Sequence, residues 1–456
     1  MNIENTSTRA QILEAFGAPD ITTPEMRLAI HDWFNLYYDG ERIPEEDPAQ
    51  RLGYTIVAKL TRTAFSEYGA STTKTGDAFC AAVLSALDRV KKTALQQSLI
   101  GGESWLKPYP TQKGWKISVL RRDRVFVFGR DGDGTPTDVG SIETTRSSTH
   151  WYNLLERRTV DAAGFLRIQN ALYMSDNADM LGARVPLSSL PRYAELIPDY
   201  IFPVPLYGLG MAYIKTPLEN TVDGSPDGVS IYAPAAEMIH TINHNEWLMS
   251  LEYDNARSRV FASSDLIKKD EFGRRTFSGS LFVGLDGDPE EVGVTTYSPA
   301  IRNQSFEERK QSSLRSIESI IGLKRGLLSE VEAVERTATE ITSSAGDYNL
   351  SIMDIQDMWT TAVKEVVRIC GILGVLYHVP GAHETDPDEV VLDYGNGVLY
   401  DEEKTWADYL DLVARGLLKP EIALGWRFGM PTETESDLQK VREKYMPASQ
   451  TEGGEE

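Results

Sequence analysis

Two histidines and two runs of acidic residues have side chains of the right type and spacing to bind a metal ion. His240 and His244 stand four residues apart, so on a helix they share one face and could bind a single metal ion. The runs DGDGTPTD at 131–138 and AHETDPDEV at 382–390 carry carboxylates close enough together to chelate a divalent cation. Each such site would need a fold that brings a complete set of ligands together.

The sequence favours a simpler interpretation of each group. No third ligand stands near His240 and His244, so both are expected to be ordinary residues of a helix surface or an interface. The run 131–138 lacks the Gly and Glu that an EF-hand loop needs at its sixth and twelfth positions, so it is interpreted as a hairpin loop. The run 382–390 is interpreted as a solvated acidic loop. We therefore predict no metal site and no cofactor.

Motifs of the common catalytic classes are missing from the sequence. There is no Gly-Lys dipeptide, which excludes a P-loop and the ATP-driven motors built on it. No Gly-x-Ser-x-Gly, His-Glu-x-x-His or Cys-x-x-Cys pattern occurs either. Two small basic clusters, at Arg121–Arg124 and at Arg274 with Arg275, are interpreted as partners in surface ion pairs. The sequence therefore favours a protein that is not an enzyme.

Length and charge set the next bounds. The chain has 456 residues, enough for two or three domain-sized units, and its formal net charge is −22. Half of this excess lies in 383–456, where eighteen acidic residues face seven basic ones. Between 257 and 302 the seven acidic and seven basic residues balance. An acidic chain of this kind is not expected to bind phosphates tightly over its whole surface, because that needs Lys and Arg.

Cysteine usage and hydropathy indicate the compartment. Cys80 and Cys370 both lie in apolar helical patterns, so they are expected to pack as small hydrophobic residues. The first residues show no signal-peptide pattern, and no apolar run reaches the ~18 residues needed to cross a bilayer. We expect synthesis in the cytosol, no disulfide bonds and no association with a membrane.

The first half of the chain changes from a helical to a strand pattern near residue 103. Three amphipathic segments, at 23–40, 47–69 and 75–102, have helical spacing. From 103 to 209 the period is two, in short β-rich runs separated by turn residues, which predicts a mostly antiparallel sheet. The positions expected to face the core in the three helices are Met26, Ile30, Trp33, Tyr37, Leu52, Ile56, Leu60, Phe79, Val83, Leu87 and Val90.

The middle of the chain predicts two helices on either side of a small β element. An extended, turn-rich stretch leads into the first helix, which Ser230 is expected to cap, with Pro234 near the first helical turn. Ser305 and Glu308 form a predicted capping box for the second helix, which Gly322 ends. The intervening 259–303 is rich in short strands and turns. The pattern is that of a helical hairpin with a β head.

A helix of about forty residues, ~60 Å long, follows. Two capping boxes could start it, one beginning at Ser329 and the other at Thr337, and the pattern does not choose between them. Gly346 is a candidate bend. Beyond it the sequence predicts a strand at 389–395, short helices such as 403–416, and an unstructured tail rich in Gly and Glu.

The stretch TPLENTVDGSPDGVSIYAPAAEMIHTI at 216–242 resembles a run in the portal proteins of tailed double-stranded-DNA bacteriophages, in the branch typical of long-tailed phages of Gram-positive hosts. The segments ALQQSLIGGESWLKPYP at 94–110, WYNLLERRTVDAAGFLRIQNALYMS at 151–175 and ERTATEI at 335–341 are similar to other runs of that family. Their order agrees over about 75–420, which is most of the chain. One departure is INHNEW at 242–247, where the family commonly has Asp.

The resemblance implies an α+β portal fold with a helical stem, a small β-containing clip, a mixed α/β wing with one long helix, and a C-terminal helical crown. The implied parts are the wing at 1–229, stem helix 1 at 230–258, the clip at 259–303, stem helix 2 at 304–321, the tunnel loop at 322–336, the long wing helix at 337–382, a wing strand at 383–400, and the crown with the acidic tail at 401–456.

The implied function is a channel in the virion. Portal proteins form a ring, usually of about twelve copies, at one vertex of the capsid. Genomic DNA is packaged through it by terminase, retained, and later ejected, without sequence specificity. The implied partners are other copies of the chain, double-stranded DNA, terminase, a head–tail adaptor, and the major capsid and scaffolding proteins. An acidic wall suits such a channel, since each tight phosphate contact would slow the sliding of DNA.

The resemblance also implies which residues meet the partners, and other readings of the sequence stay open. The residues expected to face the channel are Lys324, Arg325, Leu327, Leu328, Ser329 and Glu330. Those expected to meet terminase or an adaptor in the clip are Lys268, Lys269, Arg274 and Arg275. One alternative is an acidic hydrolase with paired carboxylates and a cleft lined by Trp151, Tyr152 and Tyr173; another is a head–tail adaptor or minor capsid protein. The number of subunits cannot be derived from residue patterns.

Overall fold

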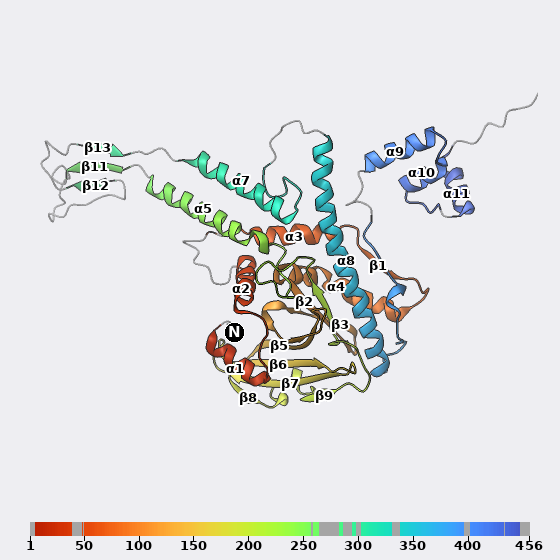
Figure 1. The fold of residues 1–456 in the computed structure, drawn as a ribbon, viewed down its shortest axis with the longest axis horizontal. Coiled ribbons are helices and arrows are strands. Elements are labelled where there is room, and N and C mark those ends of the chain that lie inside the picture. Colours follow the sequence, from red (N-terminus) through yellow and green to blue (C-terminus); the bar gives the residue numbers. More distant parts are fainter. Residues whose placement is uncertain are drawn as a thin grey trace, which may run out of the picture. The chain divides into compact units, whose positions relative to one another are not determined.

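The computed structural model describes residues 5–38, 48, 50–256, 259–263, 282–285, 294–297, 302–330, 338–395, 402–432 and 434–446. The chain divides into two compact units. The first comprises Met1–Ala64 and Ala70–Leu392, and the second comprises Phe65–Gly69 and Asp393–Glu456. The protein is a mixture of helices and strands, in agreement with the predicted α+β class (Figure 1).

The helices of the first unit begin with three short ones and end with a long one. Their bounds are α1 (Thr6–Phe16), α2 (Pro24–Tyr38), α3 (Leu52–Ala64), α4 (Ala78–Gly101), α5 (Ala236–Asn255), α7 (Asn303–Ile321) and α8 (Ala338–Leu376). The predicted helices at 23–40, 47–69 and 75–102 are confirmed as α2, α3 and α4. Gly102 ends α4 with a φ of +78°, a left-handed conformation that glycine adopts without strain.

Most strands of the first unit pair antiparallel, as the period of two predicts. The six-stranded sheet has the order β4-β5-β6-β7-β8, with β9 also paired to β7, and a three-stranded sheet has the order β10-β2-β3. The bounds of these strands are β2 (Glu103–Thr111), β3 (Gly114–Arg121), β4 (Val125–Arg130), β5 (Pro136–Ser147), β6 (His150–Val160), β7 (Leu166–Ser175), β8 (Ala183–Val185), β9 (Asp199–Ile201) and β10 (Ala212–Lys215).

Two further small sheets complete the strand pairing. Strands β1 (Gly69–Thr72) and β14 (Val390–Asp393) pair with each other. Between α5 and α7 lies a three-stranded element of order β12-β11-β13, in which β11 (Arg259–Ser263) is parallel to β12 (Phe282–Leu285) and antiparallel to β13 (Val294–Tyr297). The small β element predicted between two helices is therefore present.

The core of the first unit is built on both faces of the six-stranded sheet. On one face, Ile12 and Phe16 of α1 pack against Phe126 and Leu155. On the other face, Leu154 packs with residues of the 3-10 turns η2 (Leu187–Ser189) and η3 (Pro191–Tyr193). A third cluster joins this sheet to the three-stranded one around a fully buried tryptophan; its members are Trp105, Val125, Val139, Leu209 and Met211. Burying this apolar surface is the main driving force for folding the unit.

The long helix α8 packs along β2, β10 and α4, and Figure 1 shows it as one continuous helix. Its packed face is a stripe of buried side chains at intervals of three and four. The members of this stripe are Tyr348, Ile352, Ile355, Trp359, Val363, Val366, Cys370 and Leu373. The spacing agrees with the sequence prediction. Cys370 and Cys80 are both buried and free, as expected of small hydrophobic residues.

Residues 331–337, which precede α8, lie outside the described residues. The described helix begins at Ala338, next to the predicted capping box at Thr337, and it continues through Gly346 without a break. Ser329, of the other predicted box, donates its backbone N–H and its hydroxyl to the Glu318 carboxylate. The choice between the two boxes therefore stays a prediction.

Two predicted helix caps are wrong, because the residues before α5 and α7 make hydrogen bonds with other elements. α7 begins at Asn303 rather than at the Ser305–Glu308 box, and Arg302 before it is held by Glu252 of α5. α5 begins at Ala236 after a 3-10 turn that contains Pro234. Ser230 does not cap it, since its hydroxyl donates to the backbone carbonyl of Leu99 at 3.1 Å.

The second unit contains three short helices: α9 (Glu402–Ala414), α10 (Pro420–Arg427) and α11 (Glu435–Tyr445). Ala423, Leu438 and Val441 form its small buried centre. Glu421 is buried beside them and accepts a hydrogen bond of 2.6 Å from Arg442. Across both units, none of the helices in the described ranges combines the length and apolar character needed to cross a membrane.

Candidate functional site

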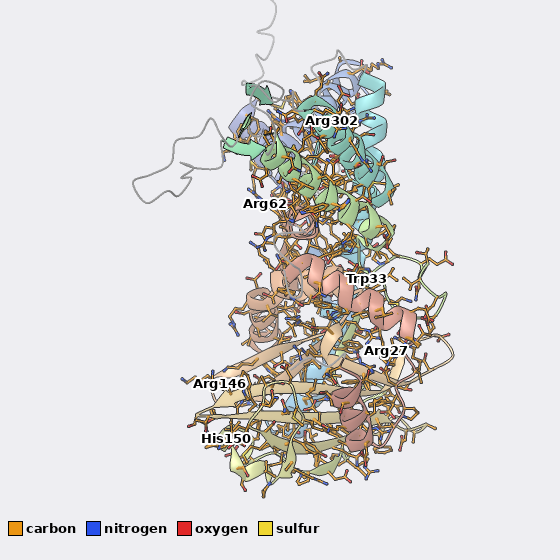
Figure 2. All side chains as sticks on the ribbon, turned by 90° about the vertical axis from the view of Figure 1, so that its left-hand side faces the viewer. Arg27, Trp33, Arg62, Arg146, His150 and Arg302 are labelled. Atoms are coloured by element: carbon orange, nitrogen blue, oxygen red, sulfur yellow. The ribbon has the colours of Figure 1, made fainter. Side chains whose placement is uncertain are left out.

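The helices α5 and α7 form an antiparallel pair that carries the β11–β13 element. Arg302 at the start of α7 (Figure 2) makes an ion pair of 2.6 Å with Glu252 near the end of α5, and Lys310 further along α7 meets Glu246 at 3.2 Å. As the residue number rises along α7 it falls along α5, so the two helices run in opposite directions. Hydrogen bonds from Arg302 lower the pKa of Glu252.

The departure INHNEW supplies polar contacts within the chain. Asn243 accepts a hydrogen bond of 3.0 Å from the backbone N–H of Gln50, and Asn245 donates one of 3.2 Å to the carbonyl of Phe306. Both asparagine side chains are buried. They therefore fix α5 against the body of the unit and against α7, because a buried amide without partners is costly.

The turn at 323–330 follows α7, and Glu318 of α7 holds it. The Glu318 carboxylate accepts hydrogen bonds from the backbone N–H of Gly326 at 3.1 Å, Leu328 at 2.5 Å and Ser329 at 2.9 Å. It also accepts one from the Ser329 hydroxyl at 2.8 Å. Burial alone would raise the pKa of Glu318, but these hydrogen bonds outweigh it and hold the pKa below its ordinary value.

Other elements hold the turn at further points. Lys59 of α3 donates to the carbonyl of Leu327 at 2.5 Å, and the N–H of Glu330 donates to the side-chain oxygen of Gln311 at 2.9 Å. Leu323 is buried at the start of the turn. Helices α3 and α7 thus fix the path of the backbone between the end of α7 and residue 330.

The structure brings together the six residues predicted to face the channel, but it does not expose all of them. Lys324, Arg325 and Glu330 are exposed, whereas Leu327 and Leu328 are half-buried and Ser329 is buried. Within the described part of the chain, neither Lys324 nor Arg325 takes part in an ion pair. Ser329 therefore has a structural role in this chain, and the two cations are the groups that a ligand could reach. The predicted clip residues Lys268, Lys269, Arg274 and Arg275 lie outside the described residues.

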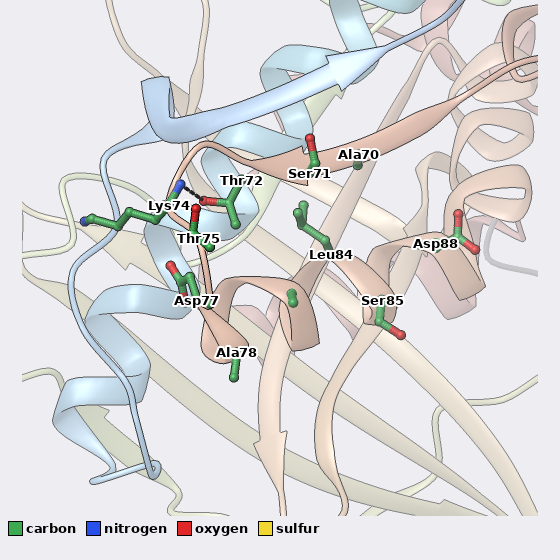
Figure 3. Close-up of a pocket in the computed structure, with 12 residues that line it drawn as sticks. Ala70, Ser71, Thr72, Lys74, Thr75, Asp77, Ala78, Leu84, Ser85 and Asp88 are labelled. Carbon is green, nitrogen blue, oxygen red and sulfur yellow. Dashed lines mark hydrogen bonds between the residues drawn. The ribbon is translucent and has the colours of Figure 1, made fainter. Parts of the chain in front are cut away.

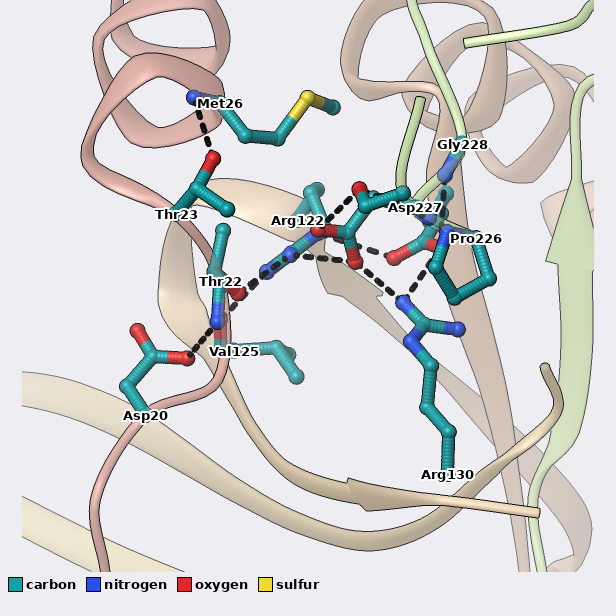
Figure 4. A network of polar contacts seen from close by, with 12 residues as sticks. Asp20, Thr22, Thr23, Met26, Arg122, Val125, Arg130, Pro226, Asp227 and Gly228 are labelled. Atoms are coloured by element: carbon teal, nitrogen blue, oxygen red, sulfur yellow. Dashed lines mark hydrogen bonds and ion pairs between the residues drawn. The ribbon is translucent and has the colours of Figure 1, made fainter. Parts of the chain in front are cut away.

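A buried cluster of ion pairs joins the segment before α5 to the β sheets (Figure 4). Glu103 is completely buried and pairs with Arg122 and Arg130, each at 2.9 Å. Asp227 pairs with the same two arginines. Burial would raise the pKa of Glu103, but the two guanidinium groups outweigh it and lower the pKa. Tyr213 completes the cluster with a hydrogen bond of 2.5 Å to Glu103.

The same joint brings two backbones into direct contact. Gly228 donates its N–H to Glu103 at 2.8 Å, and its α-carbon lies against Gly102. A Cβ built on Gly228 would stand 2.4 Å from the carbonyl oxygen of Gly102, closer than real contacts allow. The GGES and SPDG motifs, which carry part of the sequence resemblance, thus meet at one point. Only glycine fits this close approach.

The residue pattern did not predict this cluster, and the cluster corrects one prediction made from that pattern. The Arg121–Arg124 run was expected to make surface ion pairs, and Arg121 does so with Asp123 at 2.7 Å. Arg122 is instead buried in the cluster, because the 3-10 turn after β3 directs it inward toward Glu103. The only signal in the sequence was that Glu103 follows a Gly-Gly pair and that Asp227 lies in a Pro-Asp-Gly turn.

The side chains that could have bound metal are used in other ways. His240 contacts Asp32 of α2 at 2.9 Å, and His244 stacks on Trp247. Asp131 accepts two backbone hydrogen bonds within the loop that joins β4 to β5, which confirms the hairpin interpretation. His383 contacts Asp77 at 3.1 Å. Within the described ranges, no group of three or more potential ligands is close enough to hold a metal ion.

A pocket of about 770 Å³ lies beside β1 and the start of α4 (Figure 3). It is lined by Ala70, Ser71, Thr72, Lys74, Thr75, Gly76, Asp77, Ala78, Ala81, Leu84, Ser85 and Asp88. Its charged groups have structural partners: Lys74 pairs with Glu389 at 2.8 Å, Asp77 caps α4, and Asp88 pairs with Lys91 at 2.6 Å. The charged groups that line this pocket are therefore engaged in contacts within the protein.

The aromatic residues proposed for a hydrolytic cleft do not share one. Tyr152 packs with the cluster around Leu154, on one face of the six-stranded sheet. Tyr173 packs with the cluster around Leu155, on the opposite face. Trp151 is covered by Arg146, whose guanidinium lies 5.4 Å from the ring centre. Since neighbouring residues of a strand point to opposite faces, these three side chains cannot line a single cavity.

Comparison with known proteins finds similar solved structures but no matching family. No family model matches the chain, and no curated protein matches it. Among solved structures, one similar chain belongs to the neck of a native gene transfer agent (GTA) particle computed with C12 symmetry, and another to the virion of a native gene transfer agent particle. Each is 14% identical with a TM-score of 0.46, over 94% of this chain and 99% of the other. At this identity and TM-score, the likeness carries no argument about function.

Proposed function

We propose that the protein is a portal protein of a phage-like particle, whose copies form a ring around a channel for double-stranded DNA. In this proposal α5 and α7 line the channel as a stem, the β11–β13 element is the clip, and the turn at 323–330 faces the DNA. Terminase and a head–tail adaptor would bind the ring, and it would stand at one vertex of the capsid among the major capsid and scaffolding proteins.

The observation that carries the proposal is the order of elements from α5 to α8. The antiparallel helices α5 and α7 carry a small β element between them. A turn with two exposed cations follows α7, and the 39-residue helix α8 comes after it in the chain. This order follows the one that the sequence resemblance implies. An enzyme needs no such projecting pair, whereas a ring can use it to line a hole.

The charge of the chain supports a channel through which DNA slides. The net charge of −22 gives each copy an acidic surface, which repels a duplex and opposes tight binding. Lys324 and Arg325 are local exceptions that could touch phosphates briefly. Recognition through the phosphate backbone would carry no sequence information, as a conduit for a whole genome requires.

Negative-stain electron microscopy of the purified protein, with native mass spectrometry of the same sample, tests the proposal. We expect closed rings with a central hole wide enough for a duplex, and a mass that is a fixed multiple of 50.8 kDa. The multiple gives the number of subunits. If the protein stays a single compact molecule at high concentration and in the presence of capsid proteins, the proposal is wrong.

A further inference from the structure

Glu318 stands where a carboxylate is unfavourable. It lies in the last turn of α7, where the helix dipole opposes negative charge, and its side chain is buried. In the described part of the chain, its hydrogen-bond partners are the backbone N–H groups and the hydroxyl of the 323–330 turn. Placing the charged Glu318 carboxylate here costs free energy. The hydrogen bonds offset this cost only when the turn is folded against the carboxylate.

The turn that Glu318 holds presents two cations. The N–H of Leu327 donates to the carbonyl of Lys324 at 3.1 Å, which closes a four-residue β-turn with Arg325 and Gly326 in the middle. Gly326 has a φ of +89°, the conformation that the third position of a type II turn requires. Arg325 therefore lies at the tip of the turn, with Lys324 just before it, and both side chains are exposed.

The backbone on the far side of the tip is fixed on both flanks. Glu318 binds N–H groups at 326, 328 and 329, while Lys59 binds the carbonyl at 327. The peptide group between Leu327 and Leu328 is thus held from both sides, its N–H by α7 and its carbonyl by α3. The described part of this loop is a fixed turn, and its position depends on the carboxylate of one helix residue.

We propose that Glu318 is a positioning residue, whose carboxylate fixes the 323–330 turn so that Lys324 and Arg325 meet the phosphates of DNA at a set place. This inference rests on the proposed function for its ligand, the phosphate backbone of a duplex. The structural part of the inference, that the Glu318 carboxylate holds the turn, does not depend on the proposed function. Two positive charges held in fixed positions, rather than a mobile segment, would then contact the DNA.

Limited digestion of the full-length protein with trypsin tests the structural half, because trypsin cuts after Lys and Arg. The Glu318→Gln variant keeps the shape of the side chain, but it lacks the charge and turns one acceptor into a donor. We expect cleavage after Lys324 or Arg325 to become roughly tenfold faster, since proteolysis follows the population of the open form. The matched control is Glu308→Gln, the same change at an exposed position of α7, with wild-type cleavage expected.

Packaging of DNA by particles assembled with each variant tests the functional half. At equal yields of rings, we expect Glu318→Gln to lower the yield of filled heads severalfold and Glu308→Gln to leave it unchanged. An unchanged cleavage rate overturns the role of the carboxylate. Faster cleavage with normal packaging overturns the positioning role but leaves the ring proposal standing, whereas a failure to form any ring overturns the proposed function alone.

A second variant covers the case in which Glu318→Gln fails to fold. Ser329→Ala removes only one of the four donors to Glu318. We expect a smaller increase in cleavage and faster hydrogen exchange at the amides of 326, 328 and 329. Exchange at the wild-type rate at these three amides overturns the proposal.

Discussion

At the scale of single residues, three buried carboxylates are kept ionised in two ways. Glu103 and Glu156 are compensated by pairs of basic side chains, and Glu318 by the backbone of a turn. Burial acts to raise the pKa of all three, and in each case the partners outweigh it. Replacing Glu103 or Glu156 therefore leaves buried positive charge uncompensated, whereas replacing Glu318 leaves backbone N–H groups without their acceptor.

Glu103→Gln is expected to destabilise the protein by about 3 kcal/mol, because Arg122 and Arg130 would then share only the charge of Asp227. Urea unfolding followed by circular dichroism measures the change. The control is Glu143→Gln, which breaks an exposed pair with Arg192 and should cost less than about 1 kcal/mol. Equal losses in the two variants would contradict the proposed importance of the cluster.

Glu156 makes part of the stability depend on pH. Its pKa in the folded protein is about 2, where Lys107 and Arg158 overcome the effect of burial. Since an unfolded Glu titrates near about 4.3, this stability is complete above that pH and is lost as the pH falls toward the folded value. The difference in unfolding free energy between wild type and Glu156→Gln should therefore shrink between about pH 6 and pH 3. A difference that stays constant would show that the carboxylate does not titrate in this way.

At the scale of elements, the joint before α5 depends on two backbones in contact. The chain enters α5 only after Gly228 passes against Gly102, with Glu103 bonded to its N–H. The backbone conformation of Gly228 is one that other residues adopt, so the space and not the φ angle demands glycine. The entry to the helical pair is therefore a rigid, closely packed point.

Gly228→Ala is expected to destabilise the protein by about 2 kcal/mol, because the added methyl group would overlap with the carbonyl of Gly102. The melting temperature measured by calorimetry checks this. Gly132→Ala is the control, since a Cβ at Gly132 meets nothing within 4 Å, and its effect should stay within about 0.5 kcal/mol. Similar melting temperatures for the two variants would contradict the close packing inferred for the joint.

At the scale of the whole molecule, a strongly acidic chain presents two exposed cations on a fixed turn. Most of its surface would repel DNA, so a contact at Lys324 and Arg325 would stand out against the background. Such a contact is weak enough to let DNA slide, because only two cations take part and each neutralised phosphate contributes only a small part of the binding affinity.

Charge reversal by Lys324→Glu together with Arg325→Glu is expected to reduce packaging or retention of DNA severalfold while rings still form. The DNA content of purified particles is the measurement. The control reverses the same number of charges at Lys113 and Lys116, which are exposed around the β2–β3 turn, and should package like wild type. Filled heads at the wild-type rate in the first variant would remove the turn from the mechanism.

Local periodicity was enough to predict most elements. The helices around Trp33, Ile56 and Val83 and the antiparallel strands after Glu103 follow from the spacing of apolar residues, because burial of one face of an element depends on its own repeat. The stripe of α8 from Tyr348 to Leu373 is of the same kind. The six residues predicted for the turn also lie together, since they are neighbours in the chain.

What the sequence determined by itself was therefore the type of each element, its approximate length and the acidic balance of the chain. Tertiary structure decided where α5 and α7 begin, because Ser230 and Arg302 make their hydrogen bonds with distant groups rather than with the helix beside them. It also decided that Arg122 is buried and Arg325 exposed. These outcomes depend on which charged residues from separate segments meet in the folded protein. The spacing of residues along the chain does not determine these contacts.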